Sequence, residues 1–126
     1  MIVGMGIDLA EVARVEAAIA RHGRTFLERV FTPLEIGYCE RHHNRVERYA
    51  ARFAAKEATM KALGTGWRRG VRWVDIEVAN LPGGRPTLQL HGRTKQLAEE
   101  QGVRHIALSL THTSGLAFAQ VIFESG

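Results

Sequence analysis

Residues 46–66 read VERYAARFAAKEATMKALGTG, and this stretch decides the fold. Its apolar residues recur every three or four positions, the spacing of one helix face, and the glycines from Gly64 are typical of a helix C-terminus. We therefore predict one long helix from about Val46 to Leu63. Glu57 falls on the same apolar face, four residues after Phe53. Because a buried carboxylate is unfavourable unless it is paired or bound to a metal, Glu57 indicates a site.

Shorter elements are predicted on both sides of this helix. Residues 1–9 favour a buried strand that leads into a helix, and Thr32 begins a further helix as its N-cap, with Pro33 in the first turn and Glu35 three residues on. After residue 66 the pattern changes to the alternation of strands, around one more helix. These elements span, in order, 73–78, 87–91, 93–101, 106–111 and 116–123. The whole order predicts three helices before the later strands and an α+β fold with a largely antiparallel sheet.

The length and composition bound the class of protein. A chain of 126 residues with 45% apolar residues fits a single domain, 1–126. No stretch approaches the roughly 18 consecutive apolar residues of a membrane span, and the N-terminus lacks the pattern of a signal peptide. The lone Cys39 cannot form an internal disulfide. We therefore expect a cytoplasmic protein with no membrane partner.

The net charge of +4 favours an anionic partner, such as a nucleic acid, a nucleotide cofactor or an acidic protein. Nine of the basic residues lie between Arg41 and Arg72, where only Glu47 and Glu57 oppose them. The alternative is a solvated, basic helix face with no specific partner.

Asp8, at the end of the first strand, and Glu57 together offer the oxygen ligands that Mg²⁺ prefers. Arg52, Lys56 and Lys61 occupy adjacent turns of the long helix and could neutralise phosphate oxygens beside such a metal. Each residue also has a simpler interpretation. Asp8 could cap a helix, Glu57 could pair with Lys61 four residues on, and the basic residues could form a surface stripe.

Other kinds of site find little support. The six histidines show no zinc spacing, and His112 is either a site residue at a strand end or a partly buried sheet residue held by neighbouring hydroxyls. Ser109 and Ser114 lack the setting of a nucleophile, and no motif surrounds Cys39. The glycines of residues 64–66 follow a helix and are not a phosphate-binding loop.

Four segments together resemble a known family: GIDLAEV at 6–12, RFAAKEATMKALGTG at 52–66, LPGGRP at 81–86 and SLTHT at 109–113. In this order and at this length the chain resembles the holo-[acyl-carrier-protein] synthases of the 4′-phosphopantetheinyl transferase superfamily. The Phe-x-x-Lys-Glu-x-x-x-Lys core of the second segment is the most specific part. Thr111 stands where the family often has Ser, a local departure.

The resemblance implies transfer of 4′-phosphopantetheine from coenzyme A to a serine of apo-acyl carrier protein, a step of fatty acid biosynthesis that releases adenosine 3′,5′-bisphosphate. It implies Mg²⁺ as cofactor, with Asp8 and Glu57 as ligands and Lys61 on the pyrophosphate. It also implies a homotrimer whose sites lie between subunits. Arg14, Arg21 and Arg24 match the basic residues that dock the acidic carrier protein. The expected coenzyme A contacts are Arg52, Lys56, Lys61, Gly64, Gly84, Arg85, Pro86 and His112.

Three questions stay open at this point. The base for the serine hydroxyl is a metal-bound water or a nearby carboxylate, and Glu35 is either that carboxylate or only a capping residue. A nucleic-acid-binding module would explain the charge, but the aromatic-rich strands of common RNA-binding sheets are absent. A metal-dependent nuclease fits less well, because the spacing of Glu57 and Lys61 suits a helix rather than a strand.

Overall fold

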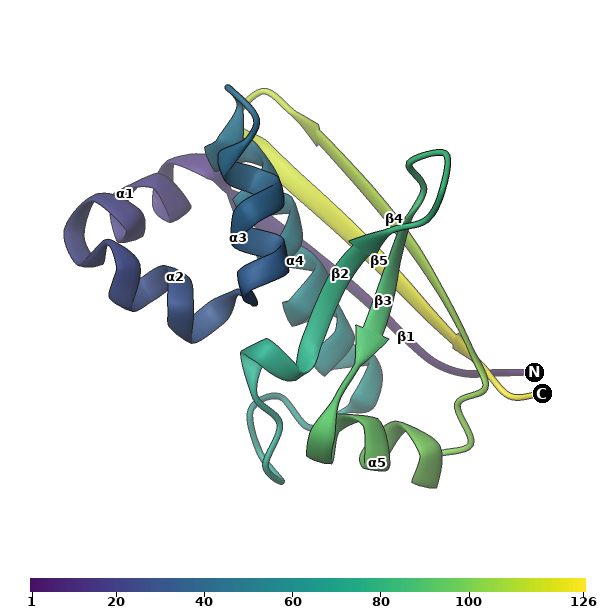
Figure 1. Cartoon of the computed structure of the whole chain (residues 1–126). Coiled ribbons are helices and arrows are strands. Elements are labelled where there is room, and N and C mark those ends of the chain that lie inside the picture. The colour runs from purple at the N-terminus through teal and green to yellow at the C-terminus, as the bar shows by residue number, and fades with distance from the viewer.

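The computed structural model describes residues 1–126 and arranges five α-helices with two antiparallel sheets (Figure 1). The larger sheet has the strand order β1–β5–β4, and β2 and β3 form a separate hairpin. The predicted α+β class is therefore confirmed. The elements are β1 (Ile2–Glu11), α1 (Val12–His22), α2 (Arg24–Val30), α3 (Pro33–Glu40), α4 (Arg45–Leu63), the 3₁₀ turn η1 (Trp73–Asp75), β2 (Ile76–Asn80), β3 (Pro86–Leu90), α5 (Gly92–Glu100), β4 (His105–Thr113) and β5 (Leu116–Glu124).

The long helix α4 is the centre of the fold, as the sequence predicts. It lies between the larger sheet and α3, while α1 and α2 extend to one side (Figure 1). Its buried alanines, Ala54, Ala55 and Ala58, join the main core with Val121 and Phe123 of β5. The helix ends at Gly64, whose positive φ of 77° provides the left-handed C-cap.

Two glycines of β1 allow α4 to approach the sheet closely. A Cβ atom at Gly6 would lie 1.9 Å from the backbone oxygen of Ala58, and one at Gly4 would lie 2.6 Å from that of Ala62. No side chain fits at either distance. The contact brings the backbone of α4 against β1 and fixes the position of Asp8 relative to this helix.

The N-terminal half differs from the prediction at two places. Four helices precede the hairpin rather than three, because Gly23, with a φ of 55°, separates α1 from α2. The first strand is also longer than predicted, since β1 pairs with β5 as far as Glu11 and α1 begins only at Val12. Asp8 therefore lies inside a strand, and the interpretation of Asp8 as a helix cap is wrong.

Two smaller predictions have opposite outcomes. The capping box is confirmed, because the Thr32 side chain accepts from the Glu35 N–H while the Glu35 side chain accepts from the Thr32 N–H. The strand expected from residue 73 instead begins at Ile76, because residues 73–75 form a 3₁₀ turn.

No helix of the structure combines the length and apolar character needed to cross a membrane.

Candidate active site

Asp8, Glu57 and Lys61 meet where the C-terminal half of α4 crosses β1. The Lys61 ammonium donates to the Asp8 Oδ1 atom at 2.9 Å and to the Ile7 carbonyl at 3.0 Å. The Asp8 side chain is only 11% exposed, whereas that of Lys61 is 57% exposed. The predicted meeting of the first strand and the long helix is therefore present, with an ammonium group open to solvent beside a largely buried carboxylate.

The charge balance of this cluster favours a cation. The Asp8 Oδ2 atom is buried and has no hydrogen-bond partner. Burial raises the pKa of Glu57, the Asp8 carboxylate raises it further, and Lys61 acts in the opposite direction. Burial makes the charged form of Glu57 less favourable, and the neighbouring Asp8 carboxylate adds repulsion that Lys61 only partly opposes.

Two carboxylates with one unpaired oxygen fit the donor set of Mg²⁺. This ion takes hard oxygen ligands in octahedral geometry and usually keeps waters or substrate phosphates beside one or two carboxylates. The structure holds no cluster of three or more His, Cys, Asp or Glu side chains suited to a metal. A pocket of about 320 Å³, lined by Ile7, Asp8, Leu9, Lys61 and Phe118, opens next to the pair.

Arg52 lies about one turn before Glu57 on α4 and is linked to the hairpin loop. Its guanidinium is 4.2 Å from the ring centroid of Tyr38 and donates to the Asn80 Oδ1 atom at 3.0 Å. Asn80 in turn donates to the carbonyl of Gly84 at 2.9 Å. The Arg52 Nε atom is buried and unpaired, so this arginine retains a donor that no group of the chain satisfies.

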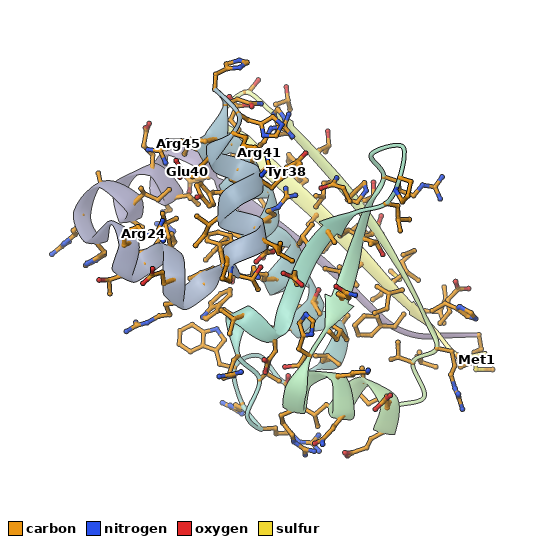
Figure 2. All side chains as sticks on the ribbon, viewed as in Figure 1. Met1, Arg24, Tyr38, Glu40, Arg41 and Arg45 are labelled. Atoms are coloured by element: carbon orange, nitrogen blue, oxygen red, sulfur yellow. The ribbon has the colours of Figure 1, made fainter.

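Further positive charge gathers around the same tyrosine. The guanidinium carbon of Arg48 is 5.5 Å from the Tyr38 ring centroid and that of Arg41 is 6.0 Å from it. Figure 2 shows Tyr38 and Arg41 beside one another at the end of α3. Arg48 also donates to the Tyr38 hydroxyl at 2.9 Å. Arg41 and Arg48 therefore bring positive charge to the accessible side of this ring, whereas Arg52 is buried.

The loop at residues 84–86 and the end of β4 lie on the hairpin side of the molecule. Arg85 and Pro86 line a pocket of about 420 Å³ together with residues 106–110 of β4. His112 pairs through its Nδ1 atom with the Glu47 carboxylate at 2.9 Å, so its partner is not a neighbouring hydroxyl. Sequence reasoning missed Glu47 as that partner, because no spacing relates a strand end to the first turn of a distant helix.

Gly64 begins an exposed loop at the other end of α4. Residues 64–69 line a pocket of about 670 Å³. Trp67, at the tip, is largely exposed and its ring meets that of Trp73 edge to face, with centroids 5.9 Å apart. Trp73 stacks on Phe53, one turn before Glu57. Sequence reasoning missed this aromatic row, since its members are far apart in the chain.

Lys56 lies in the interior of the protein and not on its surface. Neither its side chain nor that of Glu35 is exposed, and the Nζ–Oε1 distance between them is 2.8 Å. Burial lowers the pKa of Lys56, and the Glu35 carboxylate opposes that shift. The Lys56 side chain is therefore fully buried in an ion pair, whereas that of Lys61 is more than half exposed, although both lie on α4.

The predicted docking arginines lie on α1 and α2. Arg14, Arg21 and Arg24 are exposed, and Arg24, labelled in Figure 2, is the first residue of α2. Arg24 pairs with Glu28 at 3.1 Å, and Arg14 lies 3.7 Å from Glu11.

The single cysteine, Cys39, is buried, and burial raises the pKa of its thiol to about 11, so it is unreactive near neutral pH.

Comparisons with known proteins show similarity in sequence and in fold. The family model of the 4′-phosphopantetheinyl transferase superfamily matches residues 4–119. A holo-[acyl-carrier-protein] synthase of Solibacter usitatus is 62% identical over 99% of this chain and 100% of that protein. The crystal structure of the synthase from Neisseria meningitidis has a TM-score of 0.91 and 32% identity, and covers 99% of this chain and 100% of that one.

A synthase from Helicobacter pylori, solved in complex with coenzyme A, has a TM-score of 0.85 and 31% identity, over 95% of this chain and 99% of that one. The chain is therefore similar to these proteins in sequence and in fold over almost its whole length. The chain belongs to the 4′-phosphopantetheinyl transferase superfamily and, within it, to the holo-[acyl-carrier-protein] synthases.

Proposed function

We propose that this chain, as one domain over residues 1–126, transfers 4′-phosphopantetheine from coenzyme A to a serine hydroxyl of apo-acyl carrier protein. Adenosine 3′,5′-bisphosphate is the second product, Mg²⁺ is the cofactor, and the reaction serves fatty acid biosynthesis in the cytoplasm. The observation that carries the proposal is the pairing of Asp8 with Glu57 beside Lys61, in which one buried Asp8 oxygen is unpaired. Family membership supports the reaction.

Asp8 and Glu57 would hold the metal. When bound there, Mg²⁺ supplies positive charge against the pyrophosphate oxygens of coenzyme A. The exposed ammonium of Lys61 orients Asp8 through Oδ1 and has a further proton to donate to a phosphate oxygen. Its charge then offsets the negative charge that develops on the reacting phosphate.

The remaining contacts to coenzyme A are proposed to come from Arg52, Gly64, the loop of Gly84, Arg85 and Pro86, and His112. They do not converge on one point of a single chain. His112 is paired with Glu47 in the first turn of α4, and Lys61 lies almost four turns further along, about 20 Å at 1.5 Å per residue. This separation supports sites that are completed by a neighbouring copy.

We propose a homotrimer on the basis of the uncovered face of the larger sheet. Met5 and Ile7 of β1 are 58% and 62% exposed, and Leu9 follows at the same spacing of two. They share one face because side chains alternate along a strand. An exposed apolar patch of this kind is typical of a protein–protein interface.

Met5→Glu is expected to dissociate the homotrimer, because a carboxylate would be buried without a partner at the interface. Sedimentation would then give the mass of one chain, and transfer activity would fall. Leu34→Glu is the matched control, since Leu34 is an exposed apolar residue on α3. An unchanged sedimentation coefficient for Met5→Glu would contradict this interface.

Arg21→Glu is expected to raise the KM for carrier protein by roughly tenfold or more, because reversal of a charge opposite an acidic partner introduces repulsion. The KM for coenzyme A should change much less, because Arg21 is not among the proposed coenzyme A contacts. Arg104→Glu, on an exposed arginine before β4, is the control. Equal effects on the two KM values would exclude a docking role for α1.

Mass spectrometry of apo-carrier protein tests the reaction itself. Incubation with this chain, coenzyme A and Mg²⁺ should add the mass of one phosphopantetheine, and chromatography should show adenosine 3′,5′-bisphosphate in equal amount. Omission of coenzyme A and addition of EDTA are the controls. A carrier protein of unchanged mass in the complete mixture would refute the proposed function.

A further inference from the structure

The buried pair of Lys56 and Glu35 uses every proton of the lysine ammonium. Lys56 Nζ donates to the Glu35 Oε1 atom at 2.8 Å, to the Trp73 carbonyl at 3.1 Å and to the Ile76 carbonyl. An ammonium group has three protons, and all three are therefore taken by acceptors of the chain. Lys56 has no donor left for a phosphate.

Glu35 is equally enclosed. Its Oε1 atom also accepts from the Thr32 N–H at 2.9 Å, and its Oε2 atom accepts from the Val78 N–H at 2.9 Å. The side chain has no solvent exposure. A carboxylate that is bound on both oxygens and closed to substrate cannot take the proton of a serine hydroxyl. Glu35 is thus excluded as the general base.

The pair connects α4 to three elements, α3, η1 and β2, on the side away from the larger sheet. Through Glu35 it ties α4 to the first turn of α3, and through the acceptors of Lys56 and the N–H of Val78 it ties α4 to η1 and β2. On its other side α4 packs on β1 through the contact at Gly6. The helix is therefore held from two directions.

Lys56 immediately precedes Glu57 in α4. Successive side chains of an α-helix point about 100° apart around its axis, so the direction of one determines that of the next. With Lys56 released, α4 would be held by its contact with β1 and by its apolar packing alone, and a small rotation about its axis would move Glu57 relative to Asp8. The anchored ammonium prevents that rotation.

We propose that Lys56 and Glu35 are positioning residues, which hold Glu57 toward Asp8 by fixing the rotation of α4. The inference rests on the proposed function, since it concerns the residues that would bind Mg²⁺. It replaces the expected contact between Lys56 and coenzyme A with an indirect role.

A purely structural role makes a different prediction. Buried ion pairs contribute little net stability, and replacing both partners by neutral side chains is often tolerated, whereas removing one partner leaves an uncompensated charge. Lys56→Met should therefore lower the unfolding temperature strongly, and Glu35→Gln/Lys56→Met should recover much of the loss. If the pair only stabilises the chain, Mg²⁺ binding should recover together with the unfolding temperature.

Isothermal titration calorimetry of Mg²⁺ in the presence of coenzyme A provides the readout, at a temperature well below unfolding. For Glu35→Gln/Lys56→Met we expect the dissociation constant of Mg²⁺ to rise by about tenfold or more, because a displacement of about 1 Å suffices for large losses at a site. Coenzyme A binding without Mg²⁺ should be unchanged. Glu35→Gln, which keeps one acceptor oxygen, is a milder second variant with a smaller rise.

Glu77→Gln is the matched control. Glu77 is another buried carboxylate, on β2, but it accepts from the Thr32 hydroxyl and pairs with His91 and has no hydrogen bond to α4. Its variant should bind Mg²⁺ like the unchanged protein.

Two results would overturn the inference. Recovery of Mg²⁺ binding in the double variant would leave only a structural role, and weaker coenzyme A binding with normal Mg²⁺ binding would show direct contact of Lys56 with the substrate. Failure of the proposed function is a separate result, because the unchanged protein would then neither bind Mg²⁺ nor modify carrier protein.

Discussion

Asp8→Asn is expected to lower Mg²⁺-dependent transfer by at least about 100-fold, the usual size of the loss when one electrostatic group of a reacting site is removed. The amide keeps the shape of the side chain but removes the charge that the metal requires. The measurement is the rate of holo-carrier protein formation at saturating substrates. Titration of Mg²⁺ by calorimetry should show a parallel loss of affinity.

The fold should survive this change. The Asp8 Oδ2 atom has no hydrogen bond to lose, and the amide oxygen of asparagine can still accept from Lys61 in place of Oδ1. Glu100→Gln, which removes one partner of the exposed Arg93–Glu100 pair on α5, is the control and should leave transfer unchanged. Near-normal transfer by Asp8→Asn would exclude Asp8 as a metal ligand.

Glu57→Gln should have an effect of similar size, and the double variant should be little worse than either single one. Two residues that bind the same metal ion lose it together, so the losses of transition-state free energy from the two substitutions do not add. If the losses from Asp8→Asn and Glu57→Gln multiplied, the two carboxylates would have independent roles.

The long helix and its carboxylate could be predicted because their signals are local. The spacing of apolar residues around Phe53 and the glycines from Gly64 define α4 from sequence alone. Glu57 breaks that pattern, and the structure places it beside Asp8, where burial and a second carboxylate both raise its pKa. The apolar pattern of this helix, together with the one carboxylate that breaks it, was therefore sufficient to predict α4 and to single out Glu57.

The different environments of Lys56 and Lys61 could not be predicted in this way. The two lysines lie on one helix and have the same chemistry, yet one is fully buried and the other is exposed. The difference comes from Glu35 on α3 and from carbonyl groups of residues 73 and 76, all distant in sequence. Periodicity describes a helix face, whereas the partner of a buried charge depends on tertiary packing.

Gly6→Ala is expected to have the second large effect, although it alters no group with chemical function. The new Cβ atom would lie 1.9 Å from the backbone oxygen of Ala58, and no rotation of a side chain can relieve a contact with backbone. β1 and α4 must separate by roughly 1–1.5 Å to restore ordinary contact, and overpacking of this kind costs typically about 1–3 kcal/mol in the free energy of unfolding. Asp8, two residues further along β1, would move with the strand.

Because Asp8 lies on one side of this contact and Glu57 on the other, their separation should weaken Mg²⁺ binding and lower transfer by about 100-fold. Gly37→Ala is the control: Gly37 lies inside α3 with only the Arg41 side chain nearby, at 3.7 Å, and alanine there should stabilise the helix by up to about 1 kcal/mol. Denaturant unfolding and the transfer assay measure the two effects separately. If Gly6→Ala lowered stability but kept full transfer, the distance between Asp8 and Glu57 would not depend on the approach of α4 to β1. The inference that glycine is required at this position for the geometry of the site would then be wrong, and its role would be confined to packing.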